Sequence, residues 1–280
     1  MNFKTNIEKR GIELKKVDAK ELLIAFSTLF HELKSFELYP EIEIMEKLLF
    51  KMQYNCFSLL NLLNKTKFSG EEFYDIPSIF TLTRTLIENY VFFEYLFIIE
   101  SCDDLLEKDV RVLNYKIDGL KRLKFIAEVQ DDQKLMNKIN NELKNITPKI
   151  TFSKTNSKGN KGWDFLIKKS RLNNVFYRAL WSRCSNYAHS EYIFIKDINS
   201  YFSNQDVIKE RILCHSALLM ILALTIDNLR IIYTDFSKKE YNGINLKQNH
   251  LIETYIMFNK NDDELKNRMK IVKEMFNFAD

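Results

Sequence analysis

Glycine and proline are scarce in this chain, which has six Gly and three Pro among 280 residues. Folds built from many short strands need frequent turns, and Gly and Pro are the residues that turns use most. The scarcity therefore argues against a strand-rich fold and favours long helices. Hydrophobic residues make up 46% of the chain, including 22 Phe, and 29% are charged. This is the composition of a chain that buries a sizeable core.

Sequence motifs for the common cofactors are also missing. The chain has no P-loop, no Gly-rich dinucleotide fingerprint, no HExxH pair and no GxSxG nucleophile turn. Its four His lie far apart, at positions 31, 189, 215 and 250, which disfavours a His-rich metal site. We therefore expect neither a metal nor another cofactor. The net charge of +4 permits an acidic partner without requiring one.

Signals for secretion or membrane insertion are weak. No two of the four Cys form a CxxC pair or suggest a disulfide framework, so a reducing compartment fits best. The first 16 residues, MNFKTNIEKRGIELKK, lack the apolar core of a signal peptide. The most apolar stretch, Ile212 to Ile226, is shorter than the roughly 18–20 residues that span a bilayer. We expect a cytoplasmic protein without a membrane segment.

Apolar residues recur with helical spacing along most of the chain. Between Asp18 and Phe36 they recur every three or four residues, as on one face of a helix. Further long helices are expected from Pro40, after Pro77, from Asp103 to Val129, from Asp131, and from Gln205 to Tyr233. The pattern predicts an all-α fold, a helical bundle of about eight to ten helices with a C-terminal helical hairpin. We expect residues 1–236 to form the bundle and residues 237–280 to form a helical extension packed on the same domain.

One polar segment, Thr147 to Gly162, interrupts the helical pattern. It contains Pro148 and carries four lysines, namely Lys149, Lys154, Lys158 and Lys161. We predict a mobile loop here. Two interpretations stay open: a solvated linker, or a basic flap that covers a ligand bearing a phosphate.

Two charged residues lie within the apolar stretch that follows Pro77. Arg84 and Glu88 are four residues apart, so they share a helix face. A charged pair in such surroundings is costly unless both charges are satisfied. The pair is either a structural bridge that holds neighbouring helices, or an Arg that Glu88 aims at an anion. Arg suits a phosphate because its planar guanidinium donates two parallel hydrogen bonds.

A second polar group lies in the segment RALWSRCSNYAH, residues 178–189. Ser185 and His189 fall on one helix face, whereas Arg183 lies about 120° from His189 on a regular helix. Arg183 and His189 therefore converge only if the helix ends or distorts near Ala188, or if a partner chain contributes. His is suited to proton transfer near neutral pH, and a nearby Arg neutralises charge that develops on a phosphate. A core His that bonds to Ser185 or to a backbone carbonyl is the other interpretation.

These residues resemble the HEPN superfamily. The segment from Arg183 to His189 matches the R-x4-6-H pattern of that group, whose members are small helical bundles. Many of them are metal-independent ribonucleases of toxin–antitoxin, CRISPR-associated and antiphage systems, with a site formed at a dimer interface. The resemblance implies that Arg183 stabilises the phosphate and that His189 is catalytic. Cys184 departs from the pattern, which usually has Asn, Asp or His after the Arg.

A second resemblance extends over two segments. LTRTLIENYVFFEYL and YRALWSRCSNYAHSEY are similar to an uncharacterised HEPN-like bacterial family, which pairs an R-x3-E helix with a later Ser-x3-His element. Arg84, Glu88, Ser185 and His189 fit those positions. The site would then be assembled from two helices, with Arg84 in place of Arg183.

The function that this implies is a metal-independent endoribonuclease, a toxin or antiphage-defence effector. His189 would be the acid or base, Arg183 or Arg84 would hold the phosphate, and Ser185 and Glu88 would orient them. Asn186, Tyr187 and the lysines Lys154, Lys158 and Lys161 would contact the RNA. The expected partners are RNA, a second copy of the chain in a homodimer, and an antitoxin or another defence-system protein.

Two other classes of function remain open. One is a non-catalytic HEPN-like module that binds nucleic acid, a nucleotide or a partner protein. The other is a helical scaffold with an interaction surface, which exposed aromatic residues at Tyr255, Phe258 and Phe276 would support.

Overall fold

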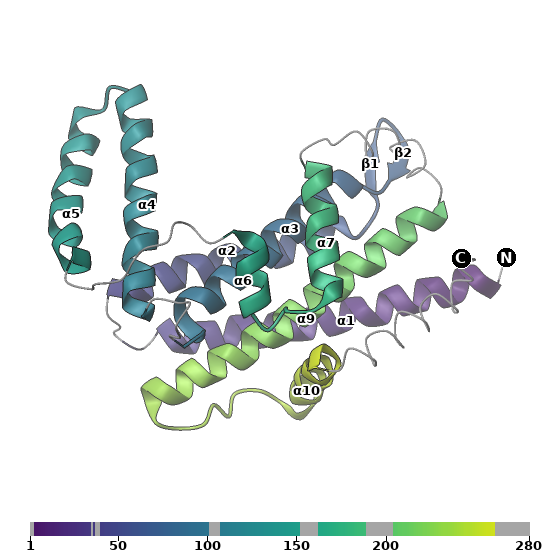
Figure 1. Ribbon diagram of the computed structural model, residues 1–280. Helices are drawn as coiled ribbons and strands as arrows, with labels where there is room; N and C mark the ends of the chain where they lie inside the picture. The colour runs from purple at the N-terminus through teal and green to yellow at the C-terminus, as the bar shows by residue number, and fades with distance from the viewer. Residues whose placement is uncertain are drawn as a thin grey trace. The chain divides into compact units, whose positions relative to one another are not determined.

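The computed structural model describes most of the chain (Figure 1). The described residues are 3–34, 36, 40–100, 107–151, 162–188 and 204–260. Within these ranges the chain forms nine α-helices, one short π-helix and a single two-stranded hairpin. The prediction of an all-α helical bundle is confirmed.

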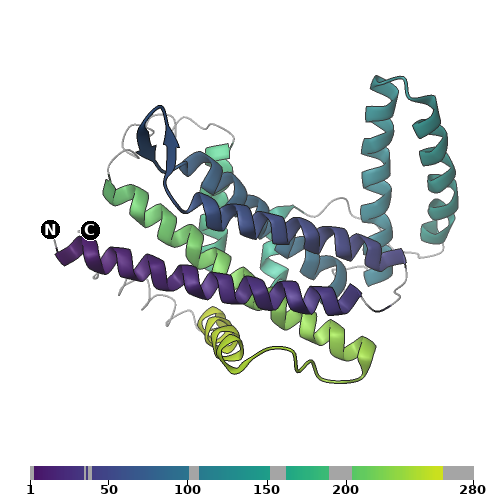
Figure 2. The ribbon, with the colours of Figure 1, turned by 180° about the vertical axis from the view of Figure 1, so that it is seen from behind.

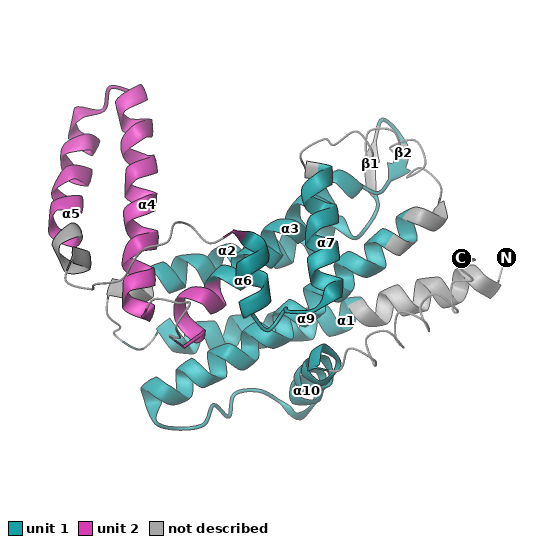
Figure 3. Cartoon of the chain, in the orientation of Figure 1, with its two compact units in different colours: residues 1–92, 163–280 teal, residues 93–162 magenta. Residues whose placement is uncertain are grey.

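The chain divides into two compact units (Figure 3). Unit 1 comprises residues 1–92 and 163–280, and unit 2 comprises residues 93–162. The C-terminal helix α10 (Leu246–Lys260) belongs to unit 1, where it packs on α1 and α9. Residues 261–280, which would complete the expected C-terminal hairpin, lie outside the described residues, so that hairpin stays a prediction.

The core of unit 1 is built around α9 (Asn204–Ser237). Its middle carries an almost unbroken run of buried side chains from Ala217 to Ile226. A helix that is apolar on all sides belongs at the centre of a bundle. Helix α1 (Phe3–Lys34) packs on α9, and both views of the ribbon show the two helices side by side (Figures 1 and 2). Helix α2 (Pro40–Leu62) packs on α1 and α9.

Helix α9 also meets the length and composition of a membrane span. Among the described residues, the segment Glu210–Ser237 of this helix is the one stretch long and apolar enough to cross a membrane. However, 83% of its most apolar window is buried inside the protein. The apolar surface of α9 is therefore covered by the other helices of unit 1.

Three further helices of unit 1 carry or adjoin the predicted site residues. They are α3 (Ile76–Phe93), α6 (Trp163–Lys169) and α7 (Val175–Ala188). Local side chains cap two of them: Asp75 accepts a hydrogen bond from the Ser78 amide, and Asn174 accepts one from the Tyr177 amide, at 3.1 and 3.0 Å. Such caps satisfy amides that have no partner within the helix. They define where α3 and α7 begin.

The short hairpin joins α2 to α3. Strands β1 (Thr66–Phe68) and β2 (Glu71–Phe73) pair in antiparallel register through the turn Ser69–Gly70. Both turn residues have positive φ, 50° and 87°. A two-residue turn of this kind matches the twist of paired strands, and Gly adopts it without strain.

Unit 2 consists of the π-helix η1 (Glu94–Ile98) and a helical hairpin of α4 (Lys108–Val129) and α5 (Gln133–Thr151). Arg111 is almost fully buried and donates hydrogen bonds to the carbonyls of Tyr95 and Ile99. It therefore satisfies carbonyls that the irregular η1 leaves without a helical partner.

Helix α5 corrects one sequence prediction. We expected a loop from Thr147, but α5 continues through Pro148 to Thr151. Proline removes one backbone donor, and near the end of a helix this interrupts few hydrogen bonds. The remainder of the expected loop, residues 152–161, lies outside the described residues.

Candidate functional site

Two side-chain contacts join α3 to α7. The indole N–H of Trp181 donates a hydrogen bond of 3.1 Å to Oε1 of Glu88. The rings of Phe80 and Tyr187 meet edge to face with their centroids 5.0 Å apart. Position 80 pairs with 187 and position 88 with 181, so the two helices run antiparallel.

Arg84 and Glu88 form the ion pair that their spacing predicts. Nε of Arg84 lies 2.8 Å from Oε1 of Glu88, and the two side chains are 21% and 19% exposed. Oε1 of Glu88 therefore accepts hydrogen bonds from both Arg84 and Trp181. One carboxylate thus fixes the direction of the guanidinium and ties it to α7.

Arg183 pairs with a carboxylate of α9. Its guanidinium donates a hydrogen bond to Oε1 of Glu210 on α9. The Glu210 side chain is only 5% exposed, so a positive partner is needed to offset the cost of burying its charge. Arg183 therefore faces α9, whereas its neighbour Trp181 contacts α3. Among the described residues, this ion pair joins α7 to α9.

The next residues of α7 are mostly enclosed. Ser185 is buried, and its hydroxyl has no hydrogen-bond partner among the described residues. Asn186 and Tyr187 are half-buried, and Tyr187 packs on Phe80 as a core aromatic residue does. Ser185 is therefore a buried polar group that has no partner among the described residues. Its predicted partner is His189.

Several predicted site residues cannot be placed. Helix α7 is described up to Ala188, and His189 lies just outside the described residues. Lys154, Lys158 and Lys161 also lie outside them. The approach of His189 to Arg84 or Arg183, and the contact of the basic segment with RNA, stay predictions.

Cys184, which stands where the HEPN pattern usually has a polar residue, is a buried thiol at the contact of α7 with α9. A hydrogen bond with the Cys214 thiol on α9, together with burial, raises the pKa of Cys184 far above its ordinary value. The thiol is therefore neutral at physiological pH and belongs to the α7–α9 contact. It does not substitute for the polar residue that usually follows the Arg of the motif.

Trp181 and Glu210 were not among the predicted site residues. Each acts across a helix contact, far away in sequence from its partner. Glu210 had a recognisable signal, since it is a carboxylate at the entry to the most apolar segment of the chain. A buried carboxylate in such a place requires a cation nearby. Trp181 gave no comparable signal.

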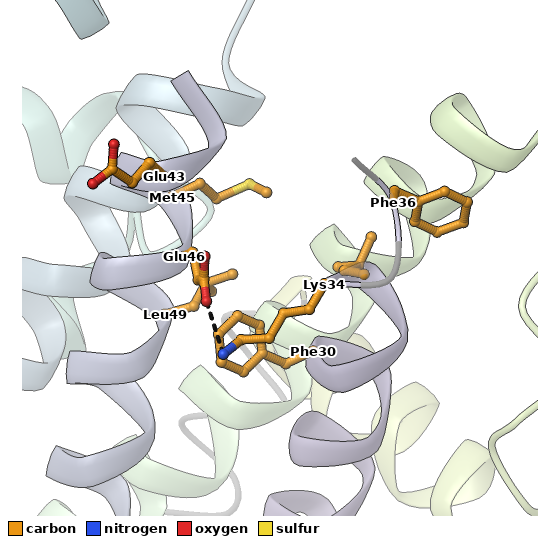
Figure 4. Close-up of a pocket in the computed structure, with 8 residues that line it drawn as sticks. Phe30, Lys34, Phe36, Glu43, Met45, Glu46 and Leu49 are labelled. Atoms are coloured by element: carbon orange, nitrogen blue, oxygen red, sulfur yellow. Dashed lines mark ion pairs between the residues drawn. The ribbon is translucent and has the colours of Figure 1, made fainter. Parts of the chain in front are cut away.

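A separate hollow of about 140 Å³ lies between the end of α1 and the start of α2 (Figure 4). Lys34 points toward Glu46 across it, with Nζ 2.8 Å from Oε1, and its Nζ lies 4.2 Å from the Phe50 ring centroid. Pockets for small-molecule ligands are commonly about 300–1,000 Å³. None of the predicted site residues lines this hollow, and it is smaller than such a pocket.

The scaffold hypothesis finds no support at Tyr255. This residue is buried and donates a hydrogen bond of 3.2 Å to Asp18 of α1, while Phe258 is half-buried. Phe276 lies outside the described residues. Tyr255 therefore attaches α10 to the bundle.

Among the described residues, no group of three or more His, Cys, Asp or Glu side chains is arranged to hold a metal ion. Comparison of the chain with protein-family models, with curated proteins and with solved structures found no match.

Proposed function

We propose that this protein is a metal-independent endoribonuclease of the HEPN type, acting as a toxin or antiphage-defence effector in the cytoplasm. One observation carries the proposal: Arg84 is held by Glu88 against α7, the helix that leads to His189. This arrangement fits the two-helix version of the resemblance better than the single-helix version. Arg183 is directed toward α9, where it pairs with the buried Glu210.

The chemistry needs a proton acceptor and a cation. A base removes the proton of the ribose 2′-hydroxyl, the 2′-oxygen attacks the adjacent phosphorus, and the 5′-oxygen of the next nucleotide leaves with a proton. The products are a 2′,3′-cyclic phosphate and a 5′-hydroxyl. In the proposal, His189 transfers protons and Arg84 stabilises the charge that develops on the phosphate. Glu88 orients Arg84, and Ser185 orients His189.

Arg183 has a positioning role in this proposal. Its bond to Glu210 fixes the rotation of α7 against α9, and so fixes the direction in which α7 presents Ser185. In a homodimer, each chain would contribute one copy of the site. Asn186, Tyr187 and the lysines Lys154, Lys158 and Lys161 would contact the RNA. An antitoxin or another defence-system protein would control the activity.

A second candidate function rests on a specific observation. Both arginines of the site are paired with a carboxylate of the same chain, and Ser185 is buried. Arginines that have a carboxylate partner within the chain, beside a buried Ser185, favour a non-catalytic HEPN-like module that binds nucleic acid, a nucleotide or a partner protein. The two functions differ in whether RNA is cleaved.

The test is RNA cleavage by the purified protein in EDTA, with product ends analysed. The wild type should give 2′,3′-cyclic phosphate ends, and His189→Ala should lower the rate by roughly 100-fold or more. His250→Ala is the matched control, because His250 is an exposed residue of α10. Circular dichroism of each variant checks its fold. Equal cleavage by wild type and His189→Ala, or none by wild type, would exclude the enzyme and leave the binding module.

A further inference from the structure

Helix α5 has two chemically distinct faces. The apolar face consists of Leu135, Met136, Ile139, Leu143 and Ile146, which are buried or half-buried. Helices α4 and α5 pack on each other as a hairpin within unit 2 (Figure 3). The apolar face of α5 is therefore used in the contact with α4, and the opposite face is left to solvent.

The solvent face of α5 carries lysine and asparagine and no acidic residue. Six exposed residues form it: Lys134, Asn137, Lys138, Asn141, Lys144 and Asn145. The positions 134, 138, 141 and 145 repeat at steps of four, three and four, which aligns them along one stripe. We call these six residues the Lys/Asn face. None of its three lysines forms an ion pair with a described residue.

The acidic residues nearby are engaged in local structure. Glu142, the one acidic residue of α5, pairs with Lys116 of α4 at 2.8 Å. Asp132 accepts a hydrogen bond from the Leu135 amide at the start of α5, and Asp131 accepts one from the Gln133 side chain. The positive charge of the Lys/Asn face is therefore not neutralised by a carboxylate on the same face.

The α4–α5 hairpin is more basic than the rest of the chain. Residues 108–151 contain ten Lys and Arg and six Asp and Glu, an excess of four basic residues. The complete chain has a net charge of +4. The excess positive charge of the protein is thus matched by this one segment, and the rest of the chain is close to neutral. Such a concentration of basic residues attracts a polyanion.

We infer that the Lys/Asn face of α5 binds the sugar–phosphate backbone of single-stranded RNA. Lysine ammonium groups bind phosphates as point charges, and asparagine amides both donate and accept hydrogen bonds. From Lys134 to Asn145 the helix rises about 16 Å, a length that accompanies roughly five stacked nucleotides. The inference deepens the proposed function, on which its choice of RNA rests.

A membrane surface fits these features less well. A helix that lies on a bilayer inserts its apolar face among the lipids. In α5 that face is occupied by α4, and the exposed face has no large apolar side chain. Nucleic acid is recognised by charge and hydrogen bonding, which are what the Lys/Asn face offers.

The experiment measures binding of a fluorescent single-stranded RNA to the full chain by anisotropy, across a range of salt concentrations. The background is His189→Ala, so that the RNA stays intact. The test variant replaces Lys134, Lys138 and Lys144 with Gln. The matched control replaces Lys20, Lys51 and Lys239 with Gln, three exposed lysines of unit 1 that lose the same charge.

The test variant should bind more weakly, and the slope of log affinity against log salt should decrease in magnitude by about 2, since each phosphate contact contributes about 0.7 on a single strand. The control should keep the slope of its parent. Unchanged RNA binding in the test variant, or equal weakening in the test variant and the control, would overturn the inference. Tighter binding to a DNA strand of the same sequence, or to vesicles of anionic lipid, would overturn the assignment to RNA.

This outcome is separable from that of the nuclease. The three Lys→Gln changes are also made in the protein that keeps His189. If this variant cleaves RNA as fast as the wild type, the enzyme is retained and the Lys/Asn face is rejected as an RNA-binding surface. RNA binding that depends on the face, without cleavage by wild type, would retain the face and reject the enzyme. Circular dichroism and thermal unfolding confirm that each triple variant keeps its helices.

Discussion

A single carboxylate oxygen, Oε1 of Glu88, holds Arg84 and Trp181 together at the contact of α3 and α7. Both donors and the acceptor are largely buried, which distinguishes this pair from an ion pair on the surface. Surface ion pairs with the same spacing contribute little, because water screens both charges. Loss of the Glu88 carboxylate would remove a hydrogen-bond acceptor from both the Arg84 guanidinium and the Trp181 indole N–H.

The residue-scale prediction concerns stability. Glu88→Ala should lower the free energy of unfolding by about 1.5–3 kcal/mol, because it removes a charge-assisted hydrogen bond from a partly buried cation. Glu43→Ala, in the exposed pair with Lys47 at the same spacing on α2, should cost about 0.5 kcal/mol or less. Urea unfolding followed by circular dichroism measures both. Equal losses of unfolding free energy in the two variants would show that the Arg84–Glu88 pair stabilises the protein no more than a surface ion pair does.

Sequence reasoning reached part of this arrangement. The four-residue spacing of Arg84 and Glu88 predicts their ion pair, because neighbours on one helix face depend only on local geometry. The partner of Arg183 could not be predicted in the same way. Glu210 lies 27 residues away on another helix, and its pairing with Arg183 depends on how α7 rotates against α9. That rotation is a property of packing.

At the scale of elements, α9 organises unit 1. Its composition predicts a buried central helix, and burial of Ala217 to Ile226 confirms this. Helix boundaries were less predictable. Helix α1 begins at Phe3, well before the expected start at Asp18, because the apolar period used to place it starts only at Leu22. The mostly polar residues before it continue the helix.

The element-scale prediction tests α9 as the core. Leu218→Ala removes a fully buried side chain and should lower the free energy of unfolding by about 2–5 kcal/mol. Ile231→Ala on the same helix removes a side chain that is 49% exposed, and should cost about 1 kcal/mol or less. Chemical denaturation of the two variants gives the comparison. An equal cost would contradict the central position of α9.

At the scale of the whole molecule, the scarcity of Gly and Pro correctly predicts that most of the described residues form helices. The division into units 1 and 2 was not foreseen. The polar segment Thr147–Gly162 ends at the second boundary, but the first boundary, at residue 93, lies within an apolar stretch that gives no sign of it. Tertiary contacts define the units, and sequence periodicity does not reveal them. The charge distribution belongs to this scale too, because the basic excess is concentrated in the α4–α5 hairpin.

The central claim is that Arg84, held by Glu88 beside α7, stabilises the phosphate during RNA cleavage. The most direct measurement compares single-turnover cleavage by Arg84→Lys and Arg183→Lys in EDTA. Both variants keep the positive charge, and each retains a cation for its carboxylate, but Lys lacks the planar fork that binds a phosphate through two hydrogen bonds. We predict that Arg84→Lys lowers the rate by roughly 100-fold, while Arg183→Lys stays close to wild type. A rate unchanged in Arg84→Lys but lost in Arg183→Lys would contradict the account.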